Sequence, residues 1–252
     1  MSEIKTLNGA LGGRVEENFA LAPLTGYKIG GPAKYYFVAE STDDVKNAVN
    51  VADELSIPIF ILARGSNVLI SDKGFLGLVI HNKSKNISVR NNEIEVDAGI
   101  NLSKLANSAR DLGLSGVEFA AGIPGSVGGA IRGNAGAWGS EIKDILAKAM
   151  IITKNGNIEE KTNEGCKFGY RESIFKESSD IILSASFKLK KSTIEEVQEK
   201  TNEIVQKKKS KQEFESPSAG CVFKNVKIDF TDEELSEKSI DSSAVNNGFI
   251  SS

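Results

Sequence analysis

The sequence contains very little histidine and cysteine, and this restricts the chemistry open to it. Among its 252 residues there is one histidine, His81, and there are two cysteines, Cys166 and Cys221. A single histidine excludes most histidine-based acid–base mechanisms and catalytic triads, and two thiols with one imidazole argue against a zinc site. The two cysteines lie far apart in the sequence, so we expect two free thiols rather than a disulfide.

Long apolar runs and an excess of one charge are also missing. The chain has 31 Lys and Arg against 34 Asp and Glu, a net charge of −3, which offers no electrostatic footprint for nucleic acid or an anionic membrane. The best apolar run, residues 57–63, has the length of a buried strand, and the N-terminus lacks the pattern of a signal peptide. We therefore expect a cytoplasmic protein without a nucleic-acid or membrane partner.

Hydrophobic periodicity predicts a mixed α/β organisation. Apolar residues recur at helical spacing from Thr42 to Leu55 and again after the N-capping Asn101. We expect an irregular lead-in with a short helix or turn over residues 1–26, and a charged helix from Thr193 to Lys211 after a domain boundary at residues 190–192. Short strands are predicted at residues 57–62, 68–70, 76–80, 87–90, 93–98, 147–153, 158–161 and 181–189.

Glycine is the residue in excess. Seven of the 24 glycines lie between Gly122 and Gly139. Glycine adopts positive φ and lets a ligand approach the main chain, and successive amides in such turns converge on anions, so this stretch is a candidate phosphate cradle. The spacing fits neither a dinucleotide-binding Gly-x-Gly-x-x-Gly motif nor a P-loop. On glycine content alone, a tightly packed turn region without a ligand stays open as the alternative.

Five segments form an ordered series of motifs over about residues 20–250. They are residues 25–33 (TGYKIGGPA), 63–70 (ARGSNVLI), 122–139 (GIPGSVGGA…GNAGAWG), 169–176 (GYRESIFK) and 217–225 (PSAGCVFKN). In this order they resemble the motifs of the UDP-N-acetylenolpyruvoylglucosamine reductase family, which acts in peptidoglycan precursor synthesis. One glycine loop would be weakly specific, whereas five motifs in one order identify a family.

The resemblance implies an α+β fold with FAD bound between two lobes. The FAD-binding domain would be of the PCMH or vanillyl-alcohol-oxidase type, with lobes at residues 1–90 and 91–189, and an incomplete α+β substrate-binding domain would follow at 190–252. FAD would bind non-covalently, with main-chain amides of residues 65–67 and 125–130 holding its pyrophosphate, while His81, outside the motifs, is expected at the surface. The residues expected to bind FAD are Arg64, Gly65, Ser66, Asn67, Gly122, Pro124, Gly125, Ser126, Gly128, Gly129, Ala130, Asn134 and Ala135.

The activity implied by the resemblance is the reduction of UDP-N-acetylglucosamine enolpyruvate to UDP-N-acetylmuramate, with NADPH as co-substrate. Arg171 would hold the enolpyruvyl carboxylate and stabilise the enolate that follows hydride transfer. Cys221 stands where the family usually has serine, and it would protonate C2. The pKa of a free thiol is about 8.5, far closer to neutrality than the pKa of an alcohol, so a thiol is a chemically suitable proton donor.

Four further residues are expected to bind the UDP-sugar substrate. Tyr170 and Ser173 would line the substrate pocket, and Lys211 and Asn225 would bind the diphosphate. At Lys211 the sequence departs from the family pattern, because Glu213 stands where the family has proline. Cys166, outside the motifs, is interpreted as a buried, inert thiol.

The sequence also differs from the family at its C-terminus. Family members continue past the position of Phe249 and Ile250, with a segment that supplies a catalytic glutamate, whereas this sequence ends at Ser252. We expect a truncated, monomeric chain that binds FAD and turns over poorly. Two alternatives stay open: a flavin- or UDP-sugar-binding module without turnover, and a flavin oxidase of the same fold.

Overall fold

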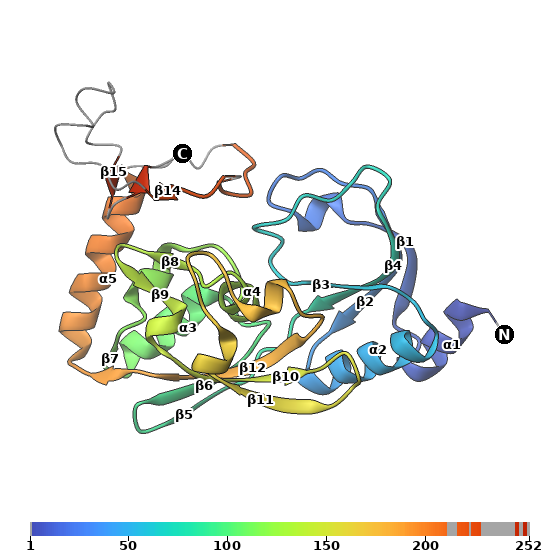
Figure 1. The fold of residues 1–252 in the computed structure, drawn as a ribbon, viewed down its shortest axis with the longest axis horizontal. Helices are drawn as coiled ribbons and strands as arrows, with labels where there is room; N and C mark the ends of the chain where they lie inside the picture. Colours follow the sequence, from blue (N-terminus) through green and yellow to red (C-terminus); the bar gives the residue numbers. More distant parts are fainter. Residues whose placement is uncertain (1, 211–215, 222, 228–244, 247–248, 251–252) are drawn as a thin grey trace.

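The protein is built around two β-sheets that lie side by side, as seen in a computed structural model (Figure 1). The structure describes residues 2–210, 216–221, 223–227, 245–246 and 249–250. Lys211, one of the expected substrate-binding residues, lies outside the described residues.

The first lobe is a four-stranded sheet in the order β1-β2-β4-β3, with α1 and α2 on one side of it and the loops of residues 21–31 and 63–74 on the other (Figure 1). Strand β1 is antiparallel to β2, whereas β2, β4 and β3 run parallel. Its elements are α1 (Glu3–Ala10), β1 (Val15–Ala20), β2 (Pro32–Ala39), α2 (Thr42–Glu54), β3 (Ile59–Leu62) and β4 (Phe75–Asn82). The side chain of Ser41 begins α2 by accepting the amide of Asp44, at 3.0 Å.

The second lobe is an antiparallel five-stranded sheet in the order β11-β10-β12-β6-β5, followed by a long helix, α5. Asn101 caps α3, since its side chain accepts the amide of Ser103 at 2.9 Å. The elements are β5 (Ile87–Arg90), β6 (Glu93–Asp97), α3 (Leu102–Asp111), β7 (Leu114–Ser115), α4 (Val127–Arg132), β8 (Gly136–Ala137), β9 (Ser140–Glu141), β10 (Leu146–Ile152), β11 (Ile158–Thr162), β12 (Ile181–Lys188), β13 (Lys190–Lys191) and α5 (Ile194–Lys209). Beyond α5 the described strands are β14 (Val226–Lys227), β15 (Val245–Asn246) and β16 (Phe249–Ile250).

The two lobes share part of their apolar core. Ile152 at the end of β10 and Leu183 in β12 are almost fully buried, and both belong to the same cluster as the apolar face of α2. That face consists of Val45, Ala48, Val49 and Ala52. Burial of this shared surface holds the lobes together along one edge, because apolar area removed from water stabilises contact.

Most of the expected elements are confirmed, and two expectations about the first lobe are wrong. Residues 68–70 form no strand, because Gly65 begins a loop that packs against residues 24–31 instead of a sheet. Residues 15–20 form an edge strand in the segment expected to be irregular, and its mostly exposed polar side chains hide the period-2 pattern.

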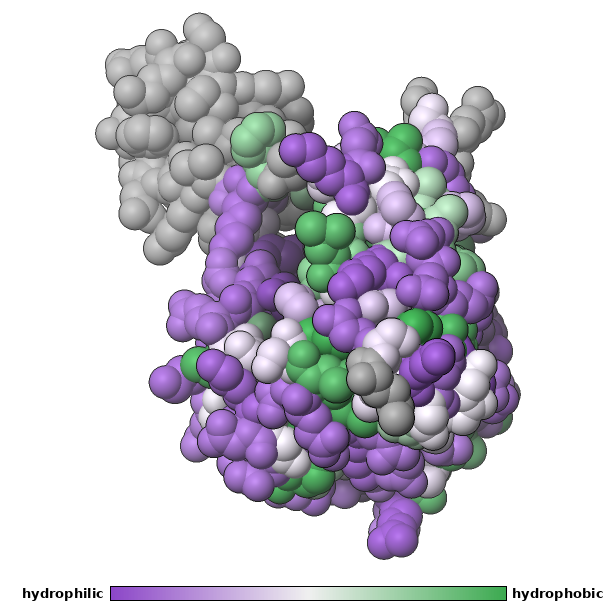
Figure 2. All heavy atoms as spheres, turned by 90° about the vertical axis from the view of Figure 1, so that its right-hand side faces the viewer, coloured by the Kyte–Doolittle hydropathy of each residue, from purple (hydrophilic) through white to green (hydrophobic). Residues whose placement is uncertain are grey.

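The face of the first lobe that Figure 2 shows is mainly hydrophilic. Viewed from the side of this lobe, apolar residues lie in small groups between hydrophilic ones (Figure 2). In the described part of the chain, no helix combines the length and the apolar character needed to cross a membrane.

Candidate functional site

A cavity of about 530 Å³ opens where the two lobes meet. Its lining includes residues of four motifs, represented by Gly26, Arg64, Pro124 and Ser218. Among the described residues, its lining holds five cations and no acidic residue; the cations are Lys28, Arg64, Lys83, Lys85 and Lys104. None of the five makes an ion pair within the described residues, so the cavity presents uncompensated positive charge to an anion.

The loop after β3 presents free amides beside this cavity. In the part of the chain that the structure describes, the amides of Gly65, Ser66 and Asn67 make no hydrogen bond. Gly65 has φ +61, and a Cβ there would lie 1.9 Å from the carbonyl oxygen of Leu24, so only glycine fits. The hydroxyl of Ser66 donates to the carbonyl of Pro124 at 2.9 Å and thereby joins the loop to the second lobe.

The second glycine run is mostly used for packing. The amides of residues 127, 128 and 130 bond to main-chain carbonyls and that of Gly129 to the hydroxyl of Ser126, so none of these four is available to a ligand. A Cβ on Gly128 would lie 2.9 Å from that of Ala98, which shows that this glycine lets α4 approach β6. Gly125 and Ser126 keep unbonded amides within the described structure, and Gly125 has φ +156. The expected cradle of residues 125–130 therefore narrows to its first two residues.

Three other predicted cofactor residues lie away from the cavity lining. Asn134 is fully buried, and its side chain bonds to Glu141, the carbonyl of Gly169 and the amide of Lys143. The amide of Ala135 donates to the carbonyl of Ala130. Gly122 contacts α5, where Lys208 bonds to its carbonyl oxygen.

His81 is buried, and the expectation of a surface histidine is wrong. Its side chain lies on β4 and lines the cavity, with only 7% of its surface exposed, and its Nδ1 is 2.5 Å from the hydroxyl of Tyr36 on β2. Burial, with the nearby charge of Lys83, lowers the pKa of His81 to about 4. The neutral imidazole is therefore part of the first lobe's framework at the wall of the cavity.

Arg171 occupies a strained turn near the C-terminal end of α4, where Ser173 bonds to the carbonyl of Arg132. Gly169 and Glu172 exchange both main-chain hydrogen bonds, so Tyr170 and Arg171 form a two-residue loop between them. Arg171 has φ +55, a left-handed conformation that costs a residue with a Cβ about 1–2 kcal/mol. Its guanidinium lies over the ring of Tyr170, 5.0 Å from the ring centre. Backbone strain of this kind clusters at functional sites.

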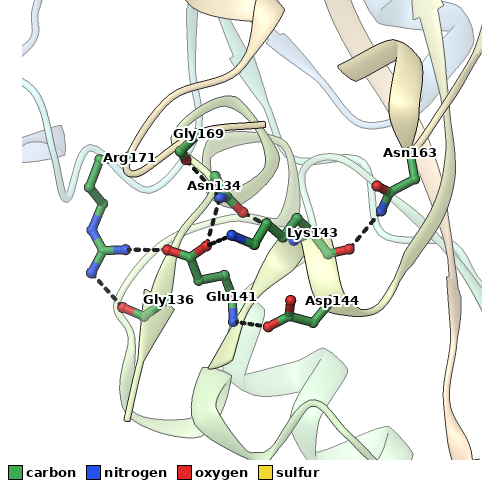
Figure 3. Close-up of polar contacts among 8 residues, drawn as sticks. All are labelled: Asn134, Gly136, Glu141, Lys143, Asp144, Asn163, Gly169 and Arg171. Atoms are coloured by element: carbon green, nitrogen blue, oxygen red, sulfur yellow. Dashed lines mark hydrogen bonds and ion pairs between the residues drawn. The ribbon is translucent and has the colours of Figure 1, made fainter. Parts of the chain in front are cut away.

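Glu141 is a component of this site that the sequence argument did not identify. The guanidinium of Arg171 donates to the carbonyl of Gly136 at 2.7 Å and lies 3.6 Å from the carboxylate of Glu141 (Figure 3). The same carboxylate accepts from Asn134 at 3.1 Å and pairs with Lys143 at 2.8 Å. The available signal was the spacing from Gly136 to Glu141 around Trp138-Gly139, which fits a two-residue hairpin.

The C-terminal motif reaches both lobes. Ser218 lines the cavity, and a Cβ on Gly26 would lie 2.4 Å from its carbonyl oxygen. Cys221 is exposed and carries a free thiol, and Lys224 pairs with Glu172, the residue after Arg171. The structure thus brings the motif of Cys221 to the side of the molecule where Arg171 lies.

The remaining predicted residues divide by burial. Ser173 is buried, and its hydroxyl donates to the carbonyl of Arg132 at 2.7 Å, so it braces the Arg171 turn against α4. Asn225 is partly buried and interacts with other residues of the protein. Cys166 is fully buried, and burial raises the pKa of its thiol to about 11, in agreement with an inert cysteine.

The cavity and its loop suit FAD. A volume of about 530 Å³ lies in the usual range for small-molecule sites of roughly 300–1,000 Å³. Unpaired amides at a turn and unpaired cations around it are the groups that bind a pyrophosphate. A Cβ at Gly65 would disrupt this turn, so its backbone geometry depends on glycine.

Comparison with known proteins agrees with these features. The family of FAD binding domains matches residues 33–161. The chain is 39% identical to UDP-N-acetylenolpyruvoylglucosamine reductase of Syntrophomonas wolfei, over 84% of this chain and 71% of that protein, and 42% identical to that of Caldanaerobacter subterraneus, over 84% and 70%. The chain belongs to the UDP-N-acetylenolpyruvoylglucosamine reductase family.

Solved structures give the same family and a wider fold. The crystal structure of UDP-N-acetylenolpyruvylglucosamine reductase from Thermus caldophilus superposes with a TM-score of 0.74 at 29% identity, over 94% of this chain and 87% of that one. A 4-ethylphenol oxidase from Gulosibacter chungangensis, with a TM-score of 0.56 and 16% identity over 75% of this chain and 42% of its own, shares the fold alone. The predicted α+β FAD-binding fold, and an FAD-dependent oxidoreductase of the UDP-N-acetylenolpyruvoylglucosamine reductase family, are confirmed.

Proposed function

We propose that this chain, as a monomer, reduces UDP-N-acetylglucosamine enolpyruvate to UDP-N-acetylmuramate with NADPH as the electron source. The observation that supports this proposal best is the placement of Arg171, whose guanidinium is fixed at a strained turn next to the motif that carries Cys221. Non-covalent FAD between the lobes would supply the redox chemistry, by accepting a hydride from NADPH and giving one to C3 of the enol ether.

The cavity residues would bind the cofactor. The free amides of residues 65–67, with those of Gly125 and Ser126, would bond the pyrophosphate, and Arg64 would add a charged donor. No covalent link is expected from His81, since its ring is buried on β4 and bonded to Tyr36.

The residues of the Arg171 turn would act on the substrate. Arg171 would bind the enolpyruvyl carboxylate through N–H groups that the protein does not use, and its charge would stabilise the enolate that develops when a hydride reaches C3. Tyr170 would line the pocket beside it, and Asn225 would bond the diphosphate together with Lys211.

Cys221 would complete the reduction. Its Sγ–H would give a proton to C2, so that the hydride and this proton together saturate the double bond and the thiolate is later reprotonated from water. The side chain is exposed, which leaves it accessible to a ligand.

The test separates the two half-reactions in Cys221→Ala. We expect NADPH to bleach the 450 nm flavin band at the rate of the wild type, while reoxidation by the enolpyruvyl substrate fails, because only the second step needs the proton. Cys221→Ser, which restores the family's usual donor, should recover turnover. A colourless protein that is indifferent to added FAD would overturn the proposal, and oxygen consumption with hydroxy acids or sugars would point to an oxidase instead.

A further inference from the structure

We propose that Glu141 is a positioning residue for Arg171, and that Lys143 offsets the negative charge of Glu141. This rests on the proposed function, in which Arg171 receives the substrate carboxylate. The contacts of Arg171, Glu141, Lys143 and Asn134 form one cluster, here called the Glu141 cluster (Figure 3).

A tight hairpin places Glu141. Strands β8 and β9 pair Gly136 with Glu141, and the two residues of the turn, Trp138 and Gly139, have φ of +57 and +82. Two positive φ values define the turn that best fits a two-residue hairpin. A Cβ on Gly136 would lie 2.6 Å from Cγ of Glu141, so glycine at 136 lets the glutamate stem cross the neighbouring strand.

The hairpin holds the guanidinium from two sides. The carbonyl of Gly136 accepts from Nη2 at 2.7 Å, and the carboxylate of its cross-strand partner Glu141 lies 3.6 Å from Nη1. A guanidinium has five N–H groups in a fixed plane, so these two contacts set its orientation and leave the others for a ligand. The side chain of Arg171 is 38% exposed, which keeps that remaining edge accessible.

The charges in the cluster favour an anionic ligand. Arg171 and Glu141 alone would cancel, and a neutral pair would attract a carboxylate weakly. Lys143 pairs with the same glutamate at 2.8 Å, and the Glu141 carboxylate raises the pKa of Lys143, so two cations share one carboxylate. These three side chains together carry a net charge of +1, which the nearby carboxylate of Asp144 partly offsets.

Glu141 is itself held in place. The side-chain Nδ2 of the buried Asn134 donates to the carboxylate of Glu141 at 3.1 Å and to the carbonyl of Gly169 at 2.8 Å. These two hydrogen bonds tie the hairpin to the Arg171 turn. The main-chain amide of Glu141 donates to Asp144 at 2.8 Å. With 18% of its side chain exposed, Glu141 is the least exposed side chain in the cluster's two ion pairs, so its contacts are less screened by solvent than those of surface pairs.

The experiment compares Glu141→Gln with Glu160→Gln. Glu160 pairs with Lys148 at 2.7 Å across β10 and β11, and both side chains are 46% exposed, so its loss removes a surface ion pair without touching Arg171. We expect Glu141→Gln to slow flavin reoxidation by the enolpyruvyl substrate about tenfold to hundredfold, with flavin reduction by NADPH unchanged. Glu160→Gln should change neither step.

Two further variants test whether Glu141 acts through Arg171. In an Arg171→Ala background, Glu141→Gln should cost less than about twofold, because the group it positions is gone. Glu141→Asp should recover part of the lost reoxidation rate, because aspartate keeps the carboxylate charge on a shorter side chain. Equal losses in both half-reactions, or an undiminished loss in the Arg171→Ala background, would overturn the proposal.

A readout without substrate separates this inference from the proposed function. The Nε–H resonance of Arg171, assigned with Arg171→Lys, should be sharp and protected from exchange in the wild type and in Glu160→Gln, and broadened in Glu141→Gln. An unchanged resonance in Glu141→Gln overturns the positioning role. If the wild type cannot reduce the enolpyruvyl substrate but Glu141→Gln still broadens the resonance, only the assigned reaction is overturned.

Discussion

The cavity between the lobes and the Glu141 cluster are both suited to anions, but they are built in opposite ways. In the described part of the chain, the five cations of the cavity have no carboxylate partner, whereas Arg171 is paired with Glu141 and bonded to a main-chain carbonyl. A pyrophosphate, which is permanently charged, is bound by many donors, so the exact orientation of each donor matters less. A reacting carboxylate needs one donor in a fixed orientation, since misplacement of the reacting atoms costs rate.

The largest expected effect is therefore at Arg171. Arg171→Ala should slow reoxidation by the enolpyruvyl substrate by about 10²–10³-fold, since removal of one preorganised donor to a developing oxyanion has that cost. Flavin reduction by NADPH, followed at 450 nm in a stopped flow, should be unaffected. If both half-reactions slowed equally, Arg171 would belong to the cofactor site and the contrast between the two regions would fail.

A substitution in the loop of residues 65–67 should have a large effect of a different kind. Gly65→Ala should abolish tight FAD binding and lower the melting temperature, because a Cβ would lie 1.9 Å from a main-chain oxygen at φ +61. Gly9→Ala in α1, where a Cβ meets nothing within 4 Å, is the matched control and should stabilise the protein by about 0.5–1 kcal/mol. Thermal melts with and without FAD test both, and tight FAD binding by Gly65→Ala would refute the loop assignment.

His81 gives a smaller, pH-dependent effect on the cavity side. The folded pKa of about 4 lies below the ordinary value of 6.5, so the unfolded chain binds the proton more readily between these values. The stability that the neutral imidazole contributes is complete above about pH 6.5 and is lost as the pH falls toward 4. Melting temperatures measured at fixed FAD concentration should fall over this window more steeply in the wild type than in His81→Gln. Equal slopes would show that the ring is protonated at little cost.

The smallest expected effect is the loss of one cavity lysine. Lys104→Gln should weaken FAD binding only a few-fold, about 0.5–1 kcal/mol, because four other cations remain and solvent screens each of them. Titration of the apoprotein with FAD at low and high salt measures this. A loss as large as that of Gly65→Ala would mean that the cavity also depends on a single donor.

The sequence predicted the family, the α+β FAD-binding fold and the starts of α2, α3 and α5, because these depend on local periodicity, caps and ordered motifs. Asn101 is an example, since its capping bond spans only two residues. The roles of the glycines were harder to assign: Gly128 and Gly136 make room for Ala98 and Glu141, contacts that depend on packing rather than on composition. The burial of His81 was missed for the same reason, since Tyr36 is 45 residues away.

The hydrogen bond from Ser66 to Pro124 has a consequence for how the protein is assembled. It joins the two loops that border the cavity, so a molecule bound there contacts both lobes at once. Any such ligand favours the docked arrangement by mass action, by RT ln(1 + [L]/Kd). Supply of the flavin vitamin to the cell would then set not only how much of this protein is active, but also how much of it survives proteolysis.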